Sequence, residues 1–185
     1  MKSIIATLTI ILATTWNASA EPLKVGDDAP QFKIKDTKGK EINLAKLARS
    51  GPVLVRLTCG CLGCDRELPY FQALHEAYRK DGIKFVAVFA EPDNKFATYV
   101  KTKKLNMQYA LDPGKDSWKT FGTNTMPSNF LIGKGGKIAA ISKGCDPSGL
   151  IARDLGDKAA NLVKTTKVDI KAKVDKKRDL NIPKK

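Results

Sequence analysis

Apolar and polar residues change their spacing along the chain in a way that predicts strands and helices in turn. Residues 32–35 alternate apolar and polar side chains, a turn-forming stretch follows at 36–39, and residues 41–44 return to the apolar pattern. This predicts a β-hairpin leading into a short helix. Residues 52–58 are a nearly continuous, β-branched apolar run, which is typical of a strand buried on both faces.

The middle of the chain continues the alternation. From residue 62 to residue 80 the apolar positions recur at spacings of three and four, which predicts one buried face of a helix. Pro69 lies inside this helix and is expected to kink it. The pattern then predicts a buried strand at 83–90, a helix at 93–103 and a short strand at 107–111.

The last predicted elements are a hairpin and a helix. A brief helical turn is expected at 117–121, followed by strands at 128–132 and 137–142, which a glycine-rich connection joins. Asp146-Pro147 resembles an N-cap with proline at the first helical position, and it opens a predicted helix to about residue 163. Strands alternating with helices indicate an α/β fold, with a mixed sheet flanked by helices.

The N-terminal residues have the three parts of a secretory signal peptide. Lys2 is followed by an apolar run at 4–13 and by the small residues Ala18-Ser19-Ala20, so cleavage is expected after Ala20. The apolar run is short for a membrane span. We therefore expect an exported protein, periplasmic or secreted, with a signal peptide at 1–20, one domain at 21–163 and a tail at 164–185.

The tail carries much of the chain's positive charge. The net charge of the chain is +14, and residues 164–185 contain nine Lys or Arg against three Asp, a net of +6. The tail has few apolar residues and no aromatic residue, which predicts a basic, disordered segment. It could contact an anionic membrane or an acidic partner weakly, or simply be solvated. No nucleic-acid partner is expected, because no recognition motif is present.

Three of the four cysteines fall within six residues, at positions 59, 61 and 64. Such crowding favours redox or metal chemistry over the stapling of distant segments. Cys61-Leu62-Gly63-Cys64 lies at the predicted strand-to-helix junction, where free backbone N–H groups and the helix dipole favour a thiolate and lower the pKa of Cys61 from about 8.5. Cys61 is thus the predicted nucleophile, and Cys64, one turn later, is placed to resolve a mixed disulfide.

The run from Val53 to Leu57, the cysteine motif and Glu67-Leu68-Pro69 together resemble the thioredoxin superfamily, in particular its exported redoxins of the TlpA/ResA type. The resemblance covers residues 28–163. It implies a thioredoxin-like fold with an N-terminal β-hairpin extension, and thiol:disulfide oxidoreductase activity without a cofactor. The implied partners are protein thiol or disulfide substrates and an upstream redox partner.

Two further positions take their meaning from this resemblance. Met126-Pro127, before a predicted strand, matches the family's cis-proline, which would border a groove for an extended substrate segment, with Met126 offering backbone contacts. Arg56 stands where thioredoxins often carry an acidic or amide residue. It is a candidate for tuning the thiolate, and the alternative is that it reaches the sheet edge or pairs with a carboxylate. Gly60 departs from the large residue that is common before the first cysteine.

Cys59 and Cys145 are not part of the usual cysteine pair. By the resemblance, Cys145 follows the last strand beside the active site, so its sulfur could approach Cys59 or Cys61. The sequence favours a structural Cys59–Cys145 disulfide in an oxidising compartment. A resolving or regulatory role for one of the two, or a zinc or copper site that uses all four cysteines, stays open.

Two other functions compete with disulfide exchange. Thr58 and Cys61 form an apparent T-x-x-C of a peroxiredoxin, but Pro127 stands where those enzymes usually have arginine. A metal carrier of the Sco type would use a histidine far downstream of the cysteines, whereas the single histidine, His75, is in the following helix. We expect His75 to be a surface residue of that helix, and no metal site is assigned from the sequence.

Overall fold

The computed structural model describes residues 22–180, so the predicted signal peptide lies outside the described residues. The chain folds around a five-stranded sheet with the order β5-β4-β3-β6-β7. Its strands are β3 (Val53–Thr58), β4 (Lys84–Phe89), β5 (Gln108–Leu111), β6 (Ser128–Ile132) and β7 (Ile138–Lys143). Strands β3, β4 and β5 are parallel, whereas β6 and β7 join as antiparallel strands. The predicted mixed sheet is confirmed.

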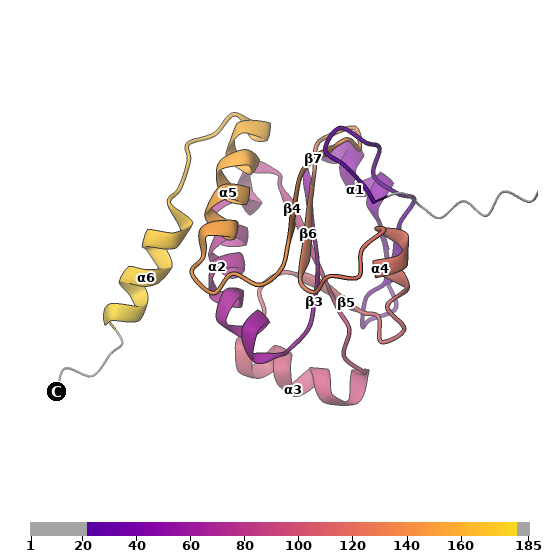
Figure 1. Ribbon diagram of the computed structural model, residues 1–185, viewed down its shortest axis with the longest axis horizontal. Helices are drawn as coiled ribbons and strands as arrows, with labels where there is room; N and C mark the ends of the chain where they lie inside the picture. Colours follow the sequence, from indigo (N-terminus) through magenta and orange to yellow (C-terminus); the bar gives the residue numbers. More distant parts are fainter. Residues whose placement is uncertain (1–21, 181–185) are drawn as a thin grey trace, which may run out of the picture.

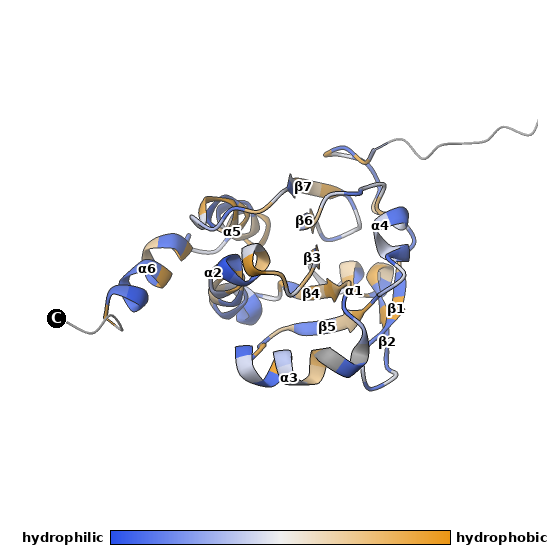
Figure 2. Ribbon diagram, turned by 60° about the horizontal axis from the view of Figure 1, so that its bottom comes forward, coloured by the Kyte–Doolittle hydropathy of each residue, from blue (hydrophilic) through white to orange (hydrophobic). Residues whose placement is uncertain are grey.

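One face of the sheet is covered by helices α2 (Leu62–Tyr78) and α5 (Leu150–Val163) (Figure 1). Phe71 and Leu74 of α2 are buried against it together with Leu155 of α5. Helix α3 (Asp93–Lys103) lies at the β5 side (Figure 2), where the Phe96 ring packs 4.4 Å from the Phe89 ring. The three- and four-residue spacing of α2 therefore corresponds to its buried face, as the sequence predicts.

The other face is covered by helix α1 (Leu44–Ser50), helix α4 (Asp116–Thr120) and a small hairpin, as Figure 1 shows. The hairpin pairs β1 (Lys33–Lys35) with β2 (Glu41–Asn43) in an antiparallel two-stranded sheet. Asn43 caps α1, because its side-chain oxygen accepts a 3.1 Å hydrogen bond from the Lys46 N–H. The predicted N-terminal hairpin leading into a short helix is confirmed.

Helix α5 begins later than the sequence predicts. It starts at Leu150, and Gly149 is its N-cap in a left-handed conformation (φ 82°). The Asp146 carboxylate accepts hydrogen bonds from the N–H groups of Ser148 and Ile151, so Asp146 stabilises the turn before the helix as well as its first turn. The sequence correctly predicts a helix after Asp146-Pro147. Asp146 is not its N-cap, however, because a turn separates it from the first helical residue.

The structure differs from the sequence prediction at the basic tail. Residues 170–180 form helix α6 (Ile170–Leu180), which packs outside α2 and α5 (Figure 1). Ile170 and Val174, four residues apart, are 0% and 7% exposed. These two apolar residues are enough to hold α6 in place, because α2 and α5 provide the surface against which they are buried. Tyr70 of α2 also donates a 2.7 Å hydrogen bond to Asp175. Among residues 22–180, no helix is long and apolar enough to cross a membrane.

Candidate active site

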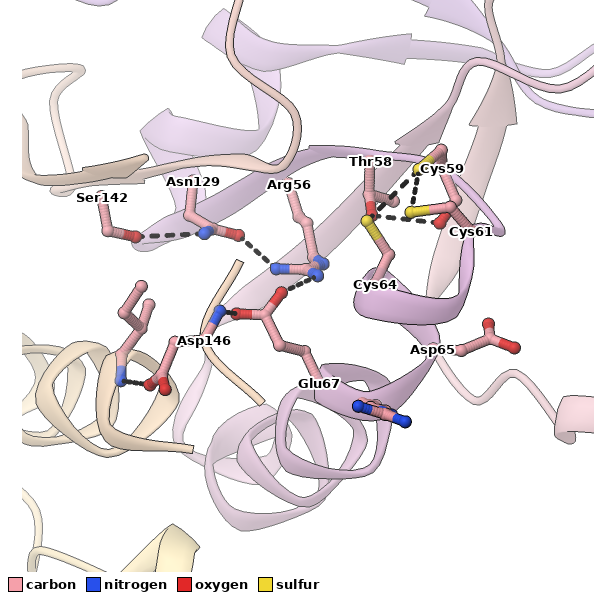
Figure 3. A network of polar contacts seen from close by, with 12 residues as sticks. Arg56, Thr58, Cys59, Cys61, Cys64, Asp65, Glu67, Asn129, Ser142 and Asp146 are labelled. Carbon is pink, nitrogen blue, oxygen red and sulfur yellow. Dashed lines mark hydrogen bonds and ion pairs between the residues drawn. The ribbon is translucent and has the colours of Figure 1, made fainter. Parts of the chain in front are cut away.

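The cysteine motif lies at the carboxyl end of the central strand β3, where the chain turns into α2 (Figure 3). Cys59 directly follows β3, Cys61 is the N-cap of α2 with an extended backbone (φ −71°, ψ 159°), and Cys64 lies in the first helical turn. The strand and the helix therefore fix both ends of the short segment that carries the sulfurs.

Three sulfur atoms point toward one another at this junction (Figure 3). The Cys59 Sγ atom lies 2.8 Å from the Cys61 Sγ atom and 3.3 Å from the Cys64 Sγ atom. Cys61 is exposed, Cys59 is half-buried and Cys64 is buried. The site thus has one sulfur open to a large substrate and two sulfurs behind it, and all four cysteines of the chain are free thiols in this structure.

The two neighbouring thiols have opposite pKa shifts. Burial opposes ionisation of Cys61, but hydrogen bonds from the Cys59 side chain and from the backbone N–H groups of Cys64 and Gly63 lower its pKa below the ordinary value. Burial raises the pKa of Cys59, and its hydrogen bond to Cys61 raises it further. Cys61 is therefore the sulfur that carries the thiolate, with Cys59 as a protonated donor beside it.

The loop between Cys59 and Cys61 is held by contacts with α3 and with the segment between β4 and α3. The Gly60 N–H donates a hydrogen bond to the Glu91 carboxylate, and a Cβ atom at position 60 would lie 3.2 Å from the Tyr99 ring. Tyr99 in turn donates a 2.7 Å hydrogen bond to Asp65 of α2. The glycine at position 60 allows the loop to pack closely on Tyr99.

Arg56 is buried beside the cysteines and is the centre of a polar row on the sheet. It pairs with Asn129 of β6 in the strand register, and Asn129 pairs with Ser142 of β7. The Arg56 guanidinium donates a 3.0 Å hydrogen bond to Asn129, and the Asn129 amide donates one of 3.0 Å to Ser142 (Figure 3). Arg56 also stacks 3.9 Å from the Phe71 ring centroid. Its head group is therefore fixed within the core and does not reach the sheet edge.

Glu67 is the carboxylate that pairs with Arg56, and it was not identified from the sequence. One oxygen accepts a 2.7 Å hydrogen bond from Arg56, and the other accepts a 2.7 Å hydrogen bond from the Asp146 N–H. Glu67 is 1% exposed. Its position on the helix, three residues after Cys64 and four before Phe71, places a carboxylate on the apolar face, which is the signal that could have identified it.

Cys145 lies in the segment that Glu67 anchors. A Cβ atom on Gly63 would be 3.0 Å from the Cys145 Sγ atom, so this sulfur packs against one of the two residues between the motif cysteines. Burial raises the pKa of Cys145, and the Glu67 charge adds to the effect. Among the described residues, Cys59 contacts Cys61 and Cys64 but not Cys145. The structure therefore does not contain the Cys59–Cys145 disulfide that the sequence favours.

Met126 and Pro127 are joined by a cis peptide bond, as the resemblance implies. Pro127 directly precedes β6, and the register pairs Ser128 with Leu57 of β3. Pro127 is consequently level with Thr58, at the same end of the sheet as the cysteines. Met126 is half-buried, and it packs against the apolar core on the face of the sheet that α1 and α4 cover.

Cys59, Cys61 and Cys64 form a group whose sulfurs all lie within 4.8 Å of one another, so they could act as metal ligands together. Cys145 is outside this group, which corrects the four-sulfur alternative. His75 is also elsewhere: its ring packs edge-to-face on Phe85, 4.9 Å between centroids. His75 is half-buried, not the surface residue that the sequence predicts, and burial lowers its pKa.

The geometry around Thr58 gives little support to the peroxiredoxin alternative, which was based on the apparent T-x-x-C motif. Thr58 is buried, and its hydroxyl donates a 3.5 Å hydrogen bond to the Cys59 carbonyl. It is therefore engaged with the backbone at the end of β3. The arginine of the same strand, Arg56, is engaged by Glu67 and Asn129.

Comparison with known sequences places the chain among redox proteins. The model of the AhpC/TSA family matches residues 25–141. The thiol-disulfide oxidoreductase ResA of Bacillus thuringiensis subsp. konkukian is 34% identical over 125 residues, which cover 67% of this chain and 72% of that relative. ResA of Bacillus subtilis is 29% identical over 128 residues, covering 69% of this chain and 72% of that relative.

Solved structures share the fold. A candidate thiol:disulfide interchange protein DsbE from Chlorobium tepidum has a TM-score of 0.69 at 22% identity, and the match covers 76% of this chain and 99% of the other. The peroxidoxin BcpB from Mycobacterium tuberculosis has a TM-score of 0.59 at 20% identity, covering 77% and 97%. At these identities the likeness concerns the fold alone, which both disulfide-exchanging and peroxide-reducing proteins use.

Proposed function

The chain belongs to the AhpC/TSA family of thioredoxin-superfamily redoxins, and from that membership we propose that it exchanges a Cys61–Cys64 disulfide with protein thiols. The observation that carries the proposal is the arrangement of the two sulfurs at the start of α2. Cys61 is exposed at the N-cap, and Cys64 is buried one turn behind it. An exposed attacking sulfur with an enclosed resolving sulfur is what thiol–disulfide exchange requires.

In the reducing direction, the Cys61 thiolate attacks one sulfur of a substrate disulfide. A bond forms between Cys61 and that sulfur, and the other substrate sulfur leaves as a thiolate. Cys64 then loses its proton and attacks the Cys61 sulfur, which releases the second substrate thiolate and leaves a Cys61–Cys64 disulfide. Two electrons pass to the substrate, and the same steps reversed would oxidise a substrate dithiol.

Backbone N–H groups help to keep Cys61 in the thiolate form that the first step requires. The backbone N–H groups of Cys64 and Gly63 help to lower the pKa of Cys61, and free N–H groups at a helix N-terminus stabilise negative charge. The Cys59 thiol donates a further hydrogen bond to the same sulfur. With its pKa lowered, Cys61 is a thiolate over a wider pH range than a free cysteine.

Met126 and Pro127 are proposed to border the substrate groove. They lie level with the end of β3, beside the cysteines, and the backbone of Met126 could pair with an extended substrate segment in the manner of strand addition. The upstream partner that returns the Cys61–Cys64 pair to its starting redox state would bind the same groove, because it must reach the same two sulfurs.

Export is the second part of the proposal, and it rests on residues 1–20 of the sequence. Its test is expression of the full chain followed by fractionation and N-terminal sequencing. Export predicts a mature chain that begins at Glu21 outside the cytosol. A chain that keeps Met1 in the cytosol would contradict it.

Enzymatic exchange is tested by the reduction of a protein disulfide, that of insulin, with a small thiol as electron donor. The wild-type protein is expected to accelerate the reaction, and Cys61→Ser and Cys64→Ser are expected to reduce the rate to background. Cys64→Ser should also accumulate a covalent adduct between Cys61 and the substrate, visible by mass spectrometry. The matched control is Cys145→Ser, another free thiol of the same region, which should keep the activity. A Cys61→Ser variant at the wild-type rate would overturn the proposal.

A further inference from the structure

We propose that Cys59, Cys61 and Cys64 also bind one Cu(I) ion through their three thiolates when the site is reduced. Disulfide exchange requires Cys61 and Cys64, and it leaves Cys59 without an assigned chemical step. Yet the Cys59 sulfur lies 2.8 Å and 3.3 Å from the other two (Figure 3). The proposal of a metal site is based on this third sulfur, which contacts both sulfurs of the redox pair.

The size of the sulfur triangle suits a soft metal ion. Three metal–sulfur bonds of about 2.3 Å in a plane place the sulfurs about 4.0 Å apart. In this structure all three sulfurs lie within 4.8 Å of one another. The Cys59 sulfur would have to move outward by only about 1 Å, which side-chain torsions can provide. Because Cys61 and Cys64 are held by α2, most of the site is formed before the ion binds.

The number of ligands favours Cu(I) over zinc. Structural zinc is nearly always bound by four ligands, and in residues 22–180 the group contains three. His75 lies 13 residues beyond the start of α2, a distance of about 20 Å along the helix, and packs on Phe85. Thiolates select soft ions, of which Cu(I) is the physiological example. A three-sulfur site without a fourth ligand therefore fits Cu(I).

The surroundings suit an anionic metal–thiolate centre that can load and unload. The cluster lies at the N-terminus of the 17-residue helix α2, and the free N–H groups of a helix N-terminus favour negative charge. Cys64 lies at the buried side and Cys61 at the exposed side. An ion bound there can consequently be reached from solvent by a competing ligand.

Binding of Cu(I) and disulfide exchange exclude each other. The ion binds the three sulfurs as thiolates, so binding releases the protons that the cysteines still carry, and no electron moves. A Cys61–Cys64 disulfide has no thiolate to offer, so oxidation of the pair removes two ligands. The reduced protein is thus the copper-binding form, and a bound ion protects the pair from exchange.

The test is an anaerobic competition between the reduced full chain and the Cu(I) chelator bathocuproine disulfonate. The wild-type protein should take one Cu(I) ion per chain. Cys59→Ser should bind it at least about tenfold more weakly, since even the loss of an outer partner of a metal ligand weakens affinity by 10–100-fold. The matched control, Cys145→Ser, removes a nearby sulfur that is outside the group and should bind as wild type does. Equal affinities of wild type and Cys59→Ser would overturn the proposal.

X-ray absorption of the copper-loaded wild-type protein tests the same claim without a variant. Three sulfur neighbours at about 2.3 Å are expected. Two sulfur neighbours would overturn the proposal, because they would leave Cys59 outside the site. Neither measurement depends on disulfide exchange, so a protein that is inactive toward insulin but binds Cu(I) through three sulfurs would contradict the proposed function and support this inference.

Discussion

The Arg56 guanidinium and the Glu67 carboxylate lie 2.7 Å apart, and their side chains are 4% and 1% exposed. This ion pair joins β3 to α2 beside the cysteines. A second pair, Lys158 with Asp154 on α5, has the same 2.7 Å separation, but its side chains are 47% and 61% exposed. The two pairs are equal in length and differ in burial, so they provide a matched comparison of a buried and an exposed interaction.

Removal of one partner of the buried pair is expected to destabilise the protein strongly. Arg56→Met leaves the buried Glu67 carboxylate without an opposite charge, which costs about 3–5 kcal/mol. Lys158→Met removes an exposed i,i+4 pair, which is worth about 0.3–0.5 kcal/mol. Urea unfolding of the reduced proteins measures both. Similar losses for the two variants would contradict the structural account of Arg56.

The double variant Arg56→Met with Glu67→Leu extends this prediction. With both charges removed, no unpaired charge remains in the core. The double variant is therefore expected to lose less stability than the sum of the two single variants. An additive loss would mean that the two side chains do not interact in the folded protein.

The lowered pKa of Cys61 predicts how its reactivity depends on pH. Burial raises the pKa, but the hydrogen bonds from Cys59 and from the backbone of Cys64 and Gly63 lower it more. The alkylation rate of Cys61 should rise with pH, with a midpoint below the pKa of about 8.5 of a free cysteine. Cys59→Ala removes a donor and should move the midpoint to higher pH. An unchanged midpoint in Cys59→Ala would show that the Cys59 thiol does not stabilise the thiolate.

The same shift predicts the stability of the reduced protein. Because the folded Cys61 has a lower pKa than the unfolded one, the unfolded chain binds more protons between the two values. The contribution of Cys61 to the free energy of unfolding is therefore present above the unfolded pKa and is lost as the pH falls through the folded pKa. Cys61→Ala should remove this dependence from urea unfolding measured across that range.

Gly149 is expected to tolerate no side chain. Its φ of +82° is unfavourable for other residues, and an added Cβ would lie 2.5 Å from two carbons of the Tyr70 ring. Gly39 has a similar φ of +79° with nothing within 4 Å, so Gly39→Ala isolates the backbone strain, about 1–2 kcal/mol. Gly149→Ala should lose more, by about 1–3 kcal/mol for the overlap with the ring. Equal melting temperatures of the two variants would contradict the packing of Tyr70 against α5.

The packing of helix α6 predicts which of its apolar residues contribute to the stability of the protein. Ile170 is fully buried, so Ile170→Ala should destabilise the protein by about 2–5 kcal/mol. Leu180, in the same helix, is 77% exposed, and Leu180→Ala should change stability by less than about 0.5 kcal/mol. Thermal unfolding distinguishes them. If Ile170→Ala were as stable as wild type, the tail would not be part of the folded domain.

Helix α6 also shows where the sequence was insufficient. The elements of the sheet and the helices that cover it follow periodic patterns and were predicted to within a few residues. The tail contains only isolated apolar residues, and its burial depends on surfaces of α2 and α5 that are distant in the sequence. The composition of residues 164–185 predicts disorder when this segment is considered without the rest of the protein. In the folded protein, other helices bury Ile170 and Val174.

The site was predictable where local patterns determine it. Cys61 and Cys64 follow from their spacing at a strand-to-helix junction, and the cis peptide at Pro127 follows from the family motif. No local pattern predicts that the Cys59 sulfur contacts Cys61 and Cys64. The conformation of this loop depends on the tertiary contacts of Gly60 with Glu91 and Tyr99. Glu67 entered the sequence analysis only as part of the family motif and was not identified as the partner of Arg56, although its spacing places it on the buried face.

A glutathione redox titration, with every cysteine located by fragment-ion mass spectrometry after acid quenching and alkylation, tests the central claim most directly. The account predicts one two-electron transition in which a Cys61–Cys64 disulfide forms and breaks reversibly while Cys59 and Cys145 remain alkylated. A bond from Cys61 or Cys64 to Cys59 or Cys145 that persists in mild reductant would contradict it.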